Sequence, residues 1–392
     1  MNENKTFQQE ASSLQEQLVS WRRRLHQIPE TGICLPQTMQ FIQSQLEEMD
    51  IVYELHEDIS CIIATIGSGG KCFLLRSDVD ALPVVEEANI PFRSTNGCMH
   101  GCGHDMHGTI LLGAAKLLKD HEQELKGTVK LLFQSGEEIF LGAKSAIAAG
   151  VLENPKVDAA FAMHVIAMMP VGFMMTGKQA MSAVDGFKIT LIGHGGHGSM
   201  PELAVDPINA AVQVYLALQS LIAREMGGSE EAVLTIGQFS AGEASNIIPE
   251  RAVLQGTLRT FNEDVRQRLV KRIREVTAGV AMTYRCQFKY EELFSCASVF
   301  ADEGVTATVE KSIRKVIPNI YIQNTAHGMG SEEFAEITQR VPSSYFMMGA
   351  GPEEESKRLG QHNPKVTFSE DVLSTGAAIY AQAAMDWLDA NS

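Results

Sequence analysis

The stretch HDMHGTILLGAAKLLKD, residues 104–120, followed by TVKLLFQS, residues 128–135, decides the fold class. The first segment repeats apolar residues at helical spacing and predicts a helix, whereas the second is a short apolar run that predicts a buried strand. Such strands alternating with helices indicate an α/β fold, with a mostly parallel mixed sheet flanked by helices. The same pattern continues on both sides at CIIATIG (61–67), KCFLLRSD (71–78), GAKSAIAAG (142–150) and VDAAFAMH (157–164).

The pattern changes near residue 181 and returns near residue 300. Between these points the strands alternate apolar and polar residues, which predicts half-exposed strands in a small α+β domain. We therefore predict a first catalytic segment at 1–180, an inserted α+β domain at 181–296, and a second catalytic segment at 297–392. The elements expected outside the opening stretch are helices at 8–28, 37–49, 263–279 and 369–390, a helix from Asp206, and strands at 186–193, 232–240, 251–261, 283–291 and 343–351.

The charge balance excludes nucleic acid as a partner. The chain has 392 residues, which suits two domains, and its 32 basic and 48 acidic side chains give a net charge of −16. A protein this acidic repels phosphate backbones. The one basic run, WRRRLHQ (21–27), lies in a helical pattern and is interpreted as a solvated face.

The number of cysteines and the lengths of the apolar runs indicate the cellular compartment of the protein. Seven cysteines are odd in number and scattered, which is not a disulfide framework. No stretch approaches the ~20 apolar residues of a membrane helix, and the opening residues MNENKTFQQE lack an apolar secretory core. We expect a cytoplasmic protein with reduced thiols and no membrane partner.

Side chains able to bind metals follow several of the predicted strands. Because functional residues in α/β proteins gather at the carboxyl ends of the strands, these side chains are expected to converge on one rim of the sheet. Taken singly, each has an ordinary alternative as a loop, turn, surface or core residue. The residues concerned are Asp78, Asp80, Cys102, His104, Glu137, Glu138 and His164.

Pairs within this set suit particular roles. Cys102 and His104 are separated by Gly103, and a glycine lets the backbone turn tightly enough to aim both neighbours at one point. Adjacent carboxylates such as Glu137 and Glu138 can supply both a metal ligand and a base for the bound water. An aspartate near the strand end can orient a ligating histidine.

Further polar residues lie in the inserted domain and after it. HGGHGSMP (194–201) is either a plain glycine-rich loop or a mobile loop that presents a histidine to a developing oxyanion. Arg259 suits a substrate carboxylate, because arginine binds carboxylates in a two-pronged manner, or it forms a surface ion pair. Asn246 lies in the same domain, and His362 precedes a proline-fixed turn.

Taken in order, these motifs resemble the aminoacylase and hippurate hydrolase family of metal-dependent amidohydrolases. The family includes N-acetyldiaminopimelate deacetylase and the indoleacetyl–amino acid hydrolases of plants. The resemblance spans residues 15–390. It rests on RSDVDALP (76–83), MHGCGHDMH (99–107), FQSGEE (133–138), AMHV (162–165), HGGHGSMP (194–201), SNIIPE (245–250), GTLRTF (256–261), GSEEFA (330–335) and GQHNP (360–364).

The resemblance implies a site built around two divalent metal ions. Zinc fits imidazole, carboxylate and thiolate ligands best, and manganese, cobalt or nickel would also fit. Cys102 would be the bridging thiolate, Glu137 the general base, His197 a catalytic histidine reaching a neighbouring subunit, and Asp80 a support for a ligand, while Asp78 is doubtful as a ligand. The implied ligands are Cys102, His104, Glu138, His164 and His362, and the implied carboxylate-binding residues are Asn246 and Arg259.

Neighbouring residues receive lesser roles. Asp105 and His107 are expected to support the ligand loop, whereas His100 and Cys98 are expected to be ordinary loop residues. Glu333 stands where the family pattern has aspartate, and we assign it no role. Ser199 replaces an alanine of the pattern after the implied catalytic histidine.

The implied activity is hydrolysis of the amide bond of N-acyl-L-amino acids by a homodimer that pairs through the inserted lid domain. Alternatives are a dipeptidase or a deacetylase of substrates such as N-acetyldiaminopimelate. A non-catalytic metal-binding protein would not need Glu137 beside Glu138. A thiol nucleophile at Cys102 would not need the glutamate pair either, and structural zinc prefers four closely spaced Cys or His ligands.

Overall fold

The computed structural model describes residues 6–392. The polar opening MNENK, part of the segment interpreted as lacking a secretory core, lies outside this range. The chain divides into two compact units. The first comprises Met1–Ala180, Val299–Ala326 and Glu333–Ser392, and the second comprises Met181–Ser298 and His327–Glu332. The predicted insert ended at residue 296, and the short return segment 327–332 was not predicted.

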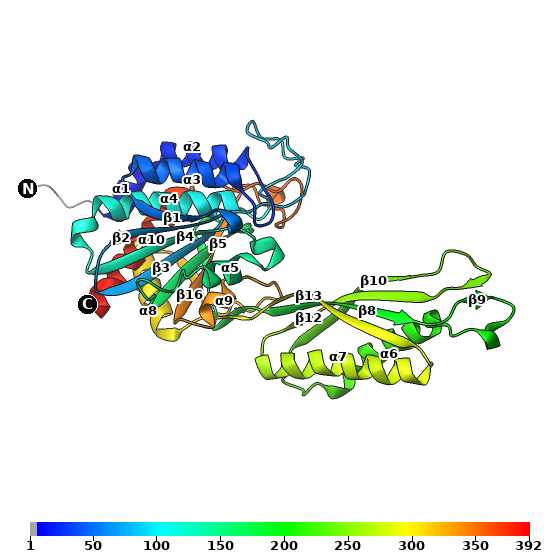
Figure 1. Cartoon of the computed structure of the whole chain (residues 1–392). Helices are drawn as coiled ribbons and strands as arrows, with labels where there is room; N and C mark the ends of the chain where they lie inside the picture. The colour runs from blue at the N-terminus through cyan, green and yellow to red at the C-terminus, as the bar shows by residue number, and fades with distance from the viewer. Residues whose placement is uncertain (1–5) are drawn as a thin grey trace, which may run out of the picture. The chain divides into compact units, whose positions relative to one another are not determined.

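The first unit is an α/β domain, as its alternating pattern predicted (Figure 1). Its helices are α1 (Phe7–Ser13), α2 (Gln15–His26), α3 (Pro36–Glu48), α4 (His104–Asp120), α5 (Gly142–Ala148), α8 (Glu303–Val316), α9 (Ala335–Thr338) and α10 (Val372–Asn391). Its sheet strands are β1 (Val52–His56), β2 (Cys61–Gly67), β3 (Lys71–Asp78), β4 (Gly127–Gln134), β5 (Ala159–Pro170), β6 (Phe173–Met175), β15 (Tyr321–Gln323) and β16 (Ser343–Gly351).

The eight strands lie in the order β1-β2-β4-β3-β5-β16-β6-β15. The central four, β4, β3, β5 and β16, are parallel, whereas β1, β2 and β6 pair antiparallel with a neighbour. From β3 the chain moves to β4 on one side and then to β5 on the other. Ligands of open α/β sheets bind where the strand order reverses in this way, at the carboxyl ends of the strands.

Apolar helix faces cover the central strands. Phe73, Leu75 and Phe161 belong to one continuous core with Leu18, on α2, and Leu112, on α4. All five side chains are fully buried, so their removal from water stabilises the sheet. The buried sheet thereby holds its strand ends rigidly.

Three sequence predictions in this unit need correction. The helix expected over 8–28 breaks at Leu14 into α1 and α2. The run WRRRLHQ is not a solvated face throughout, because Arg22 and His26 are only 2% exposed. His164 does not end its strand, since the apolar sequence after it carries β5 on to Pro170.

The second unit is an α+β domain. Its four-stranded antiparallel sheet has the order β10-β12-β8-β13, and α6 and α7 pack against it through Leu218, Leu254 and Leu269. Of the helices that the structure describes in either unit, none is long and apolar enough to cross a membrane. The elements of this unit are β8 (Ala183–Ile192), β9 (Gly196–His197), α6 (Pro207–Glu225), β10 (Ala232–Ala241), β11 (Ile247–Ile248), β12 (Arg251–Thr260), α7 (Glu263–Thr283) and β13 (Gln287–Cys296).

The last helix and strand of this unit differ from the prediction. Helix α7 continues to Thr283, because Thr277 and Ala281 extend its buried stripe. Arg285 then takes a left-handed φ of 60°, and β13 begins at Gln287 rather than at residue 283.

Candidate metal centre

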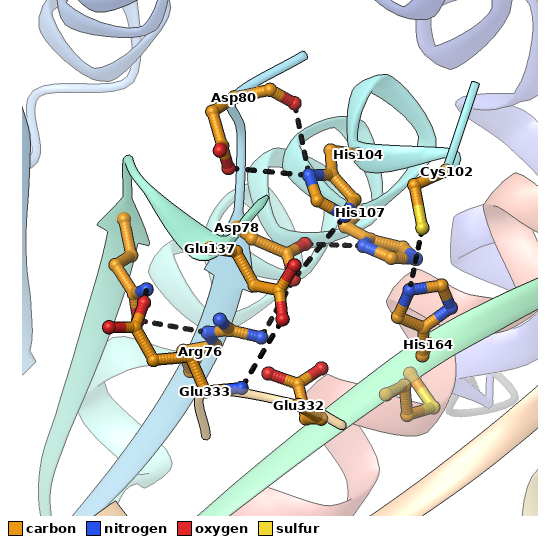
Figure 2. A network of polar contacts seen from close by, with 12 residues as sticks. Arg76, Asp78, Asp80, Cys102, His104, His107, Glu137, His164, Glu332 and Glu333 are labelled. Carbon is orange, nitrogen blue, oxygen red and sulfur yellow. Dashed lines mark hydrogen bonds and ion pairs between the residues drawn. The ribbon is translucent and has the colours of Figure 1, made fainter. Parts of the chain in front are cut away.

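The loop from Gly101 to His104 places two potential ligands at the start of α4 (Figure 2). Gly103 has a φ of +90°, and a Cβ there would lie 2.5 Å from Val165 Cγ2. Only glycine meets both conditions without strain. The tight turn directs Cys102 and His104 to the carboxyl ends of β3 and β5.

His104 is held with one ring nitrogen aimed into the site. Its Nδ1 lies 3.0 Å from the carbonyl oxygen of Asp80 and 3.4 Å from Asp80 Oδ1. A carbonyl only accepts, so Nδ1 carries a proton and, in the neutral ring, Nε2 presents a lone pair. Nε2 is buried and has no hydrogen-bond partner among the described residues. Asp80 therefore makes the contact that orientation of a ligating histidine requires.

Cys102, on the loop before α4, lies opposite His164, on β5. The Sγ of Cys102 lies 3.5 Å from His164 Nε2. His164 Nδ1 donates to the carbonyl oxygen of Val165 at 2.7 Å, so Nε2 is again the nitrogen with a lone pair. Both imidazoles thus present Nε2 to the same region as the thiol (Figure 2).

Glu138 and His362 approach the thiol from two further segments. Glu138 lies in the 3-10 turn Glu137–Ile139 after β4, and its backbone N–H donates to Asp80 Oδ2 at 3.1 Å. His362 Nε2 lies 3.5 Å from Glu138 Oε1. The His362 backbone has a left-handed φ of 66° and donates to the carbonyl oxygen of Gly101 at 2.9 Å, which ties the late loop to the ligand loop.

Among the described residues, four groups of three side chains could hold a metal ion, and two of these groups share Cys102. Cys102, His104 and His164 make one group, and Cys102, Glu138 and His362 make the other. Within each group the ligand atoms lie within 4.8 Å of one another. Buried polar atoms are nearly always hydrogen-bonded, yet His104 Nε2 and Glu138 Oε1 have no hydrogen-bond partner within residues 6–392. This set of nitrogen, sulfur and oxygen donors fits divalent metal ions such as zinc.

Burial sets the protonation of these groups in the protein alone. It raises the pKa of the Cys102 thiol well above its usual range and lowers the pKa of His164 well below its own. Burial also raises the pKa of Glu138. For His104, burial opposes protonation, but Asp78 together with Asp80 and Cys102 outweighs it and raises the pKa. Metal ions would therefore have to displace a proton from the thiol, as thiolate ligation requires.

Asp78 and His107 lie beside the two groups but are already engaged with each other. His107 Nδ1 lies 2.5 Å from Asp78 Oδ1, and its Nε2 accepts the backbone N–H of Val165 at 2.9 Å. Arg76 binds the other oxygen of Asp78 at 2.8 Å. Burial opposes ionisation of Asp78, but Arg76, His104 and His107 together outweigh it and hold the pKa of that carboxyl below its usual range. With both ring nitrogens used, His107 supports β5 rather than binding a metal.

Glu137 belongs to neither of the two groups that contain Cys102. A carboxylate oxygen of Glu137 lies within 4.8 Å of ligand atoms of His104 and Glu138. Its Oε1 accepts the backbone N–H of Glu333 at 3.2 Å (Figure 2). The side chain is only 7% exposed. This is a suitable position for a general base acting on a water held between the ligands.

Behind the ligand loop lies a buried network of charges that the sequence interpretation missed. Asp105 Oδ2 lies 2.7 Å from Arg22 Nε and 2.8 Å from His26 Nδ1. His26 Nε2 lies 3.0 Å from Glu86, which also accepts the backbone N–H of Ser94 at 2.7 Å. Only the helical position of Arg22 and His26, four residues apart and flanked by apolar residues, could have indicated this network.

The two remaining residues of the loop behave differently from each other. Cys98 is half-buried, and its carbonyl oxygen accepts the hydroxyl of Ser94 at 2.5 Å. His100 is not an exposed loop residue, because it is 1% exposed, and burial lowers its pKa to about 3. It is therefore neutral and packs beside His26, with ring centroids 6.3 Å apart.

His197 and Asn246 come together in the second unit. His197 on β9 pairs with Ile247 on β11, and the carbonyl oxygen of Asn246 accepts the N–H of Gly198 at 2.8 Å. The Nδ1 of His197 accepts the backbone N–H of Ser199 at 3.1 Å, with the Ser199 hydroxyl 2.7 Å away. The proton therefore resides on the exposed Nε2, which is free to donate.

Arg259 lies on β12 of the four-stranded sheet, at the end away from the β9–β11 pair. Its register partner on β8 is Val184, whereas Arg251, eight residues earlier on β12, pairs with Ile192. The β9–β11 ladder continues beyond Ile192, so Arg259 and Asn246 are separated along the strand by at least about 27 Å. Within one chain the two side chains cannot bind the same carboxylate.

The guanidinium of Arg259 is anchored on one side only. Its Nη1 donates to the carbonyl oxygen of Met329 at 2.7 Å and to Ser331 Oγ at 3.1 Å. Nε and Nη2 have no hydrogen-bond partner in the described chain. That edge of the guanidinium matches the two oxygens of a carboxylate.

Comparison with known proteins agrees with this geometry. The peptidase family M20/M25/M40 matches residues 74–386. An N-acetylcysteine deacetylase of Bacillus subtilis is 34% identical over 94% of this chain and 96% of its own length. An IAA-amino acid hydrolase of Arabidopsis thaliana is 35% identical over 95% of this chain and 86% of its own.

A solved structure extends the agreement to the fold. A dinuclear metal-binding peptidase of the M20 family from Bacillus subtilis superimposes with a TM-score of 0.81. It is 31% identical, and the match covers 96% of this chain and 99% of that one. The chain therefore belongs to peptidase family M20/M25/M40 and is a metal-dependent hydrolase of amide bonds.

Proposed function

We propose that the protein hydrolyses N-acyl-L-amino acids to a carboxylic acid and a free amino acid, as aminoacylases and hippurate hydrolases do. One observation carries the proposal: Cys102 belongs to two groups of donor atoms, and Glu137 lies within reach of His104 and Glu138 in a further group that lacks the thiol. A thiolate shared by two groups suits a site for two divalent ions. The carboxylate of Glu137, which is in neither group that contains Cys102, suits a general base.

The residues of the chain would act in sequence. Two bound divalent ions, zinc being the best fit to the donors, would lower the pKa of a shared water and polarise the amide carbonyl. Glu137 would take the proton of that water and later return it to the leaving amine. Asp80 keeps His104 Nε2 aimed at the site while this happens.

The chemistry of the substrate follows from the relatives and from Arg259. Both N-acetylcysteine and an IAA-amino acid, named for two relatives, carry an acyl group on an amino-acid nitrogen. Such molecules have a free carboxylate on the amine side of the scissile bond. The open edge of Arg259 would bind it, with Nη1 fixed by Met329 and Ser331.

His197 and Asn246 would serve the site of a partner subunit. They lie at least about 27 Å along the sheet from Arg259, so one chain cannot supply all three to one substrate. A homodimer formed through the inserted domain would resolve this separation. His197, with its proton on Nε2, would then donate to the developing oxyanion of the partner's substrate.

A panel of N-acyl amino acids tests the proposal. The purified protein is assayed with acetyl, benzoyl, longer acyl and indoleacetyl derivatives, with N-acetyldiaminopimelate, and with dipeptides. Each assay is repeated after EDTA treatment and after zinc, manganese, cobalt or nickel is added back. Metal-dependent cleavage of N-acyl amino acids supports the proposal. Cleavage confined to dipeptides, or activity that survives chelation, would refute it.

A further inference from the structure

A chain of buried polar side chains crosses the carboxyl ends of β3 and β4. Arg76 Nε donates to Gln134 Oε1 at 3.1 Å, and Gln134 Nε2 donates to Glu333 Oε2 at 2.8 Å. Gln134 and Glu333 are 0% exposed and Arg76 is 2% exposed. None of these three residues belongs to the ligand groups, and Figure 2 shows Arg76 and Glu333 beside Asp78 and Glu137.

The amide of Gln134 can adopt only one orientation in this chain. A guanidinium has donors and no acceptor, so it must face the amide oxygen. The Glu333 oxygen accepts the hydrogen bond from the other side, so it must face the amide nitrogen. A flipped amide would leave two buried contacts unsatisfied, and each such loss is costly in a water-free interior.

The two ends of the chain reach groups of the reaction centre. At one end, the backbone N–H of Glu333 donates to Glu137 Oε1 at 3.2 Å. At the other, Arg76 Nη1 binds Asp78 Oδ2 at 2.8 Å, and Asp78 in turn holds His107. Gln134 thus links two parts of the site. One is Glu333, whose backbone N–H holds Glu137, and the other is β3, whose Asp78 holds His107.

We propose that Gln134 is a positioning residue that fixes the general base Glu137 through Glu333. By holding the Glu333 side chain, it sets the place of the backbone N–H that orients one Glu137 oxygen. The inference rests on the proposed function of Glu137, and it also gives Glu333 a role that its departure from the family pattern left open. Gln134 itself need not touch substrate or metal.

An exchange of the two side chains separates positioning from simple packing. Gln134→Glu keeps the shape and the contact to Arg76 but removes the donor to Glu333, so two carboxyl groups meet in a dry interior. The double variant Gln134→Glu, Glu333→Gln restores one amide and one carboxylate in reversed places. Its carboxylate accepts from Arg76 and from the new amide, and the net charge is that of the natural chain.

Steady-state rates, bound metal and far-UV circular dichroism are measured for the natural protein, Q134E, Q134E/E333Q and E137Q. We expect Q134E to lose at least tenfold in kcat, with KM and metal content within twofold, and the double variant to recover most of that loss. A Q134E variant with unchanged kcat, or a double variant no faster than the single one, overturns the inference.

Two further variants keep the outcomes distinct. If E137Q keeps its rate, the proposed role of the base fails; if E137Q is inactive while Q134E is unchanged, only the positioning role fails. If Q134E does not fold, Gln134→Met, which adds no charge, is measured in its place. It should show the same loss in kcat, and an unchanged kcat would overturn the inference.

Discussion

The two sides of the loop 99–108 differ in how their charged groups are engaged. On the side toward β3 and β5, His104 Nε2 is buried without a hydrogen-bond partner among the described residues and lies at ligand spacing from Cys102 and His164. On the opposite side, Asp105 Oδ2 lies within 2.8 Å of both Arg22 and His26. Burial is similar on the two sides, so it does not distinguish a site from a core.

This difference separates the residues that serve the reaction from the residues that stabilise the fold. Buried donor atoms left without hydrogen-bond partners raise the free energy of the folded protein, and where several of them lie at ligand spacing a metal ion can complete them. Atoms that complete one another hold the loop in place. Substitutions on the side of the metal ligands should therefore change rate or metal binding, and those on the opposite side should change the free energy of unfolding.

The largest effect is expected from Glu137→Gln. The amide cannot take a proton from water, so kcat should fall by about 10²–10⁴-fold while metal content stays unchanged. Elemental analysis and steady-state kinetics on the same preparation check this. A variant that turns over near the natural rate would remove Glu137 as the base.

The next effect is expected on the opposite side of the loop. Arg22→Ala leaves Asp105 as a buried charge without its guanidinium, and breaking such a pair costs about 3–5 kcal/mol of unfolding free energy. The neighbouring Arg23, whose side chain is 45% exposed, is the matched control, and Arg23→Ala should cost less than about 1 kcal/mol. Urea unfolding measures the free energy of unfolding of both variants. Equal losses would show that burial does not determine how much an ion pair contributes to stability.

A smaller effect is expected in the second unit, at Arg259. Removing a charged hydrogen-bond partner costs about 1.5–3 kcal/mol, which corresponds to a rise of about 10–100-fold in KM for substrates with a free carboxylate. Arg259→Ala should leave metal content unchanged. The amide of the substrate carboxyl group is the control ligand, and its KM should hardly move. Equal KM changes for both substrates would show that Arg259 does not bind the substrate carboxylate.

The smallest effect is expected from an exposed ion pair of the same unit. Arg272 on α7 contacts Glu225 at 2.7 Å at the surface, where solvent screens the charges. Arg272→Ala should change neither the unfolding midpoint nor the rate measurably. A clear loss of stability would mean that surface pairs of this unit contribute more than their exposure suggests.

Periodicity predicted the architecture well because the core obeys it. The run 343–351 forms β16 over the predicted residues, and the change of pattern near 181 coincides with the boundary of the second unit. The breaks at Leu14 and Arg285 were missed, since a local turn leaves no mark in an apolar repeat.

The ligand residues could be proposed from strand ends and motifs, but their surroundings could not. That Arg22 and Asp105 meet, or that Gln134 faces both Arg76 and Glu333, depends on packing between segments far apart in sequence. The pairing of Asn246 with Arg259 looked reasonable in sequence, because the twelve residues between them give no sign that β12 separates the two within one chain.

Metal stoichiometry tests the central claim, that Cys102 is shared by two metal-binding groups, most directly. The natural protein and the variants Cys102→Ala, His164→Ala and His362→Ala are stripped with chelator, titrated with zinc and analysed for bound metal. We predict two tightly bound ions per natural chain, one after either histidine substitution, and weakened binding of both after Cys102→Ala. One ion per natural chain, or a Cys102→Ala variant that binds both ions as tightly as before, would contradict the account.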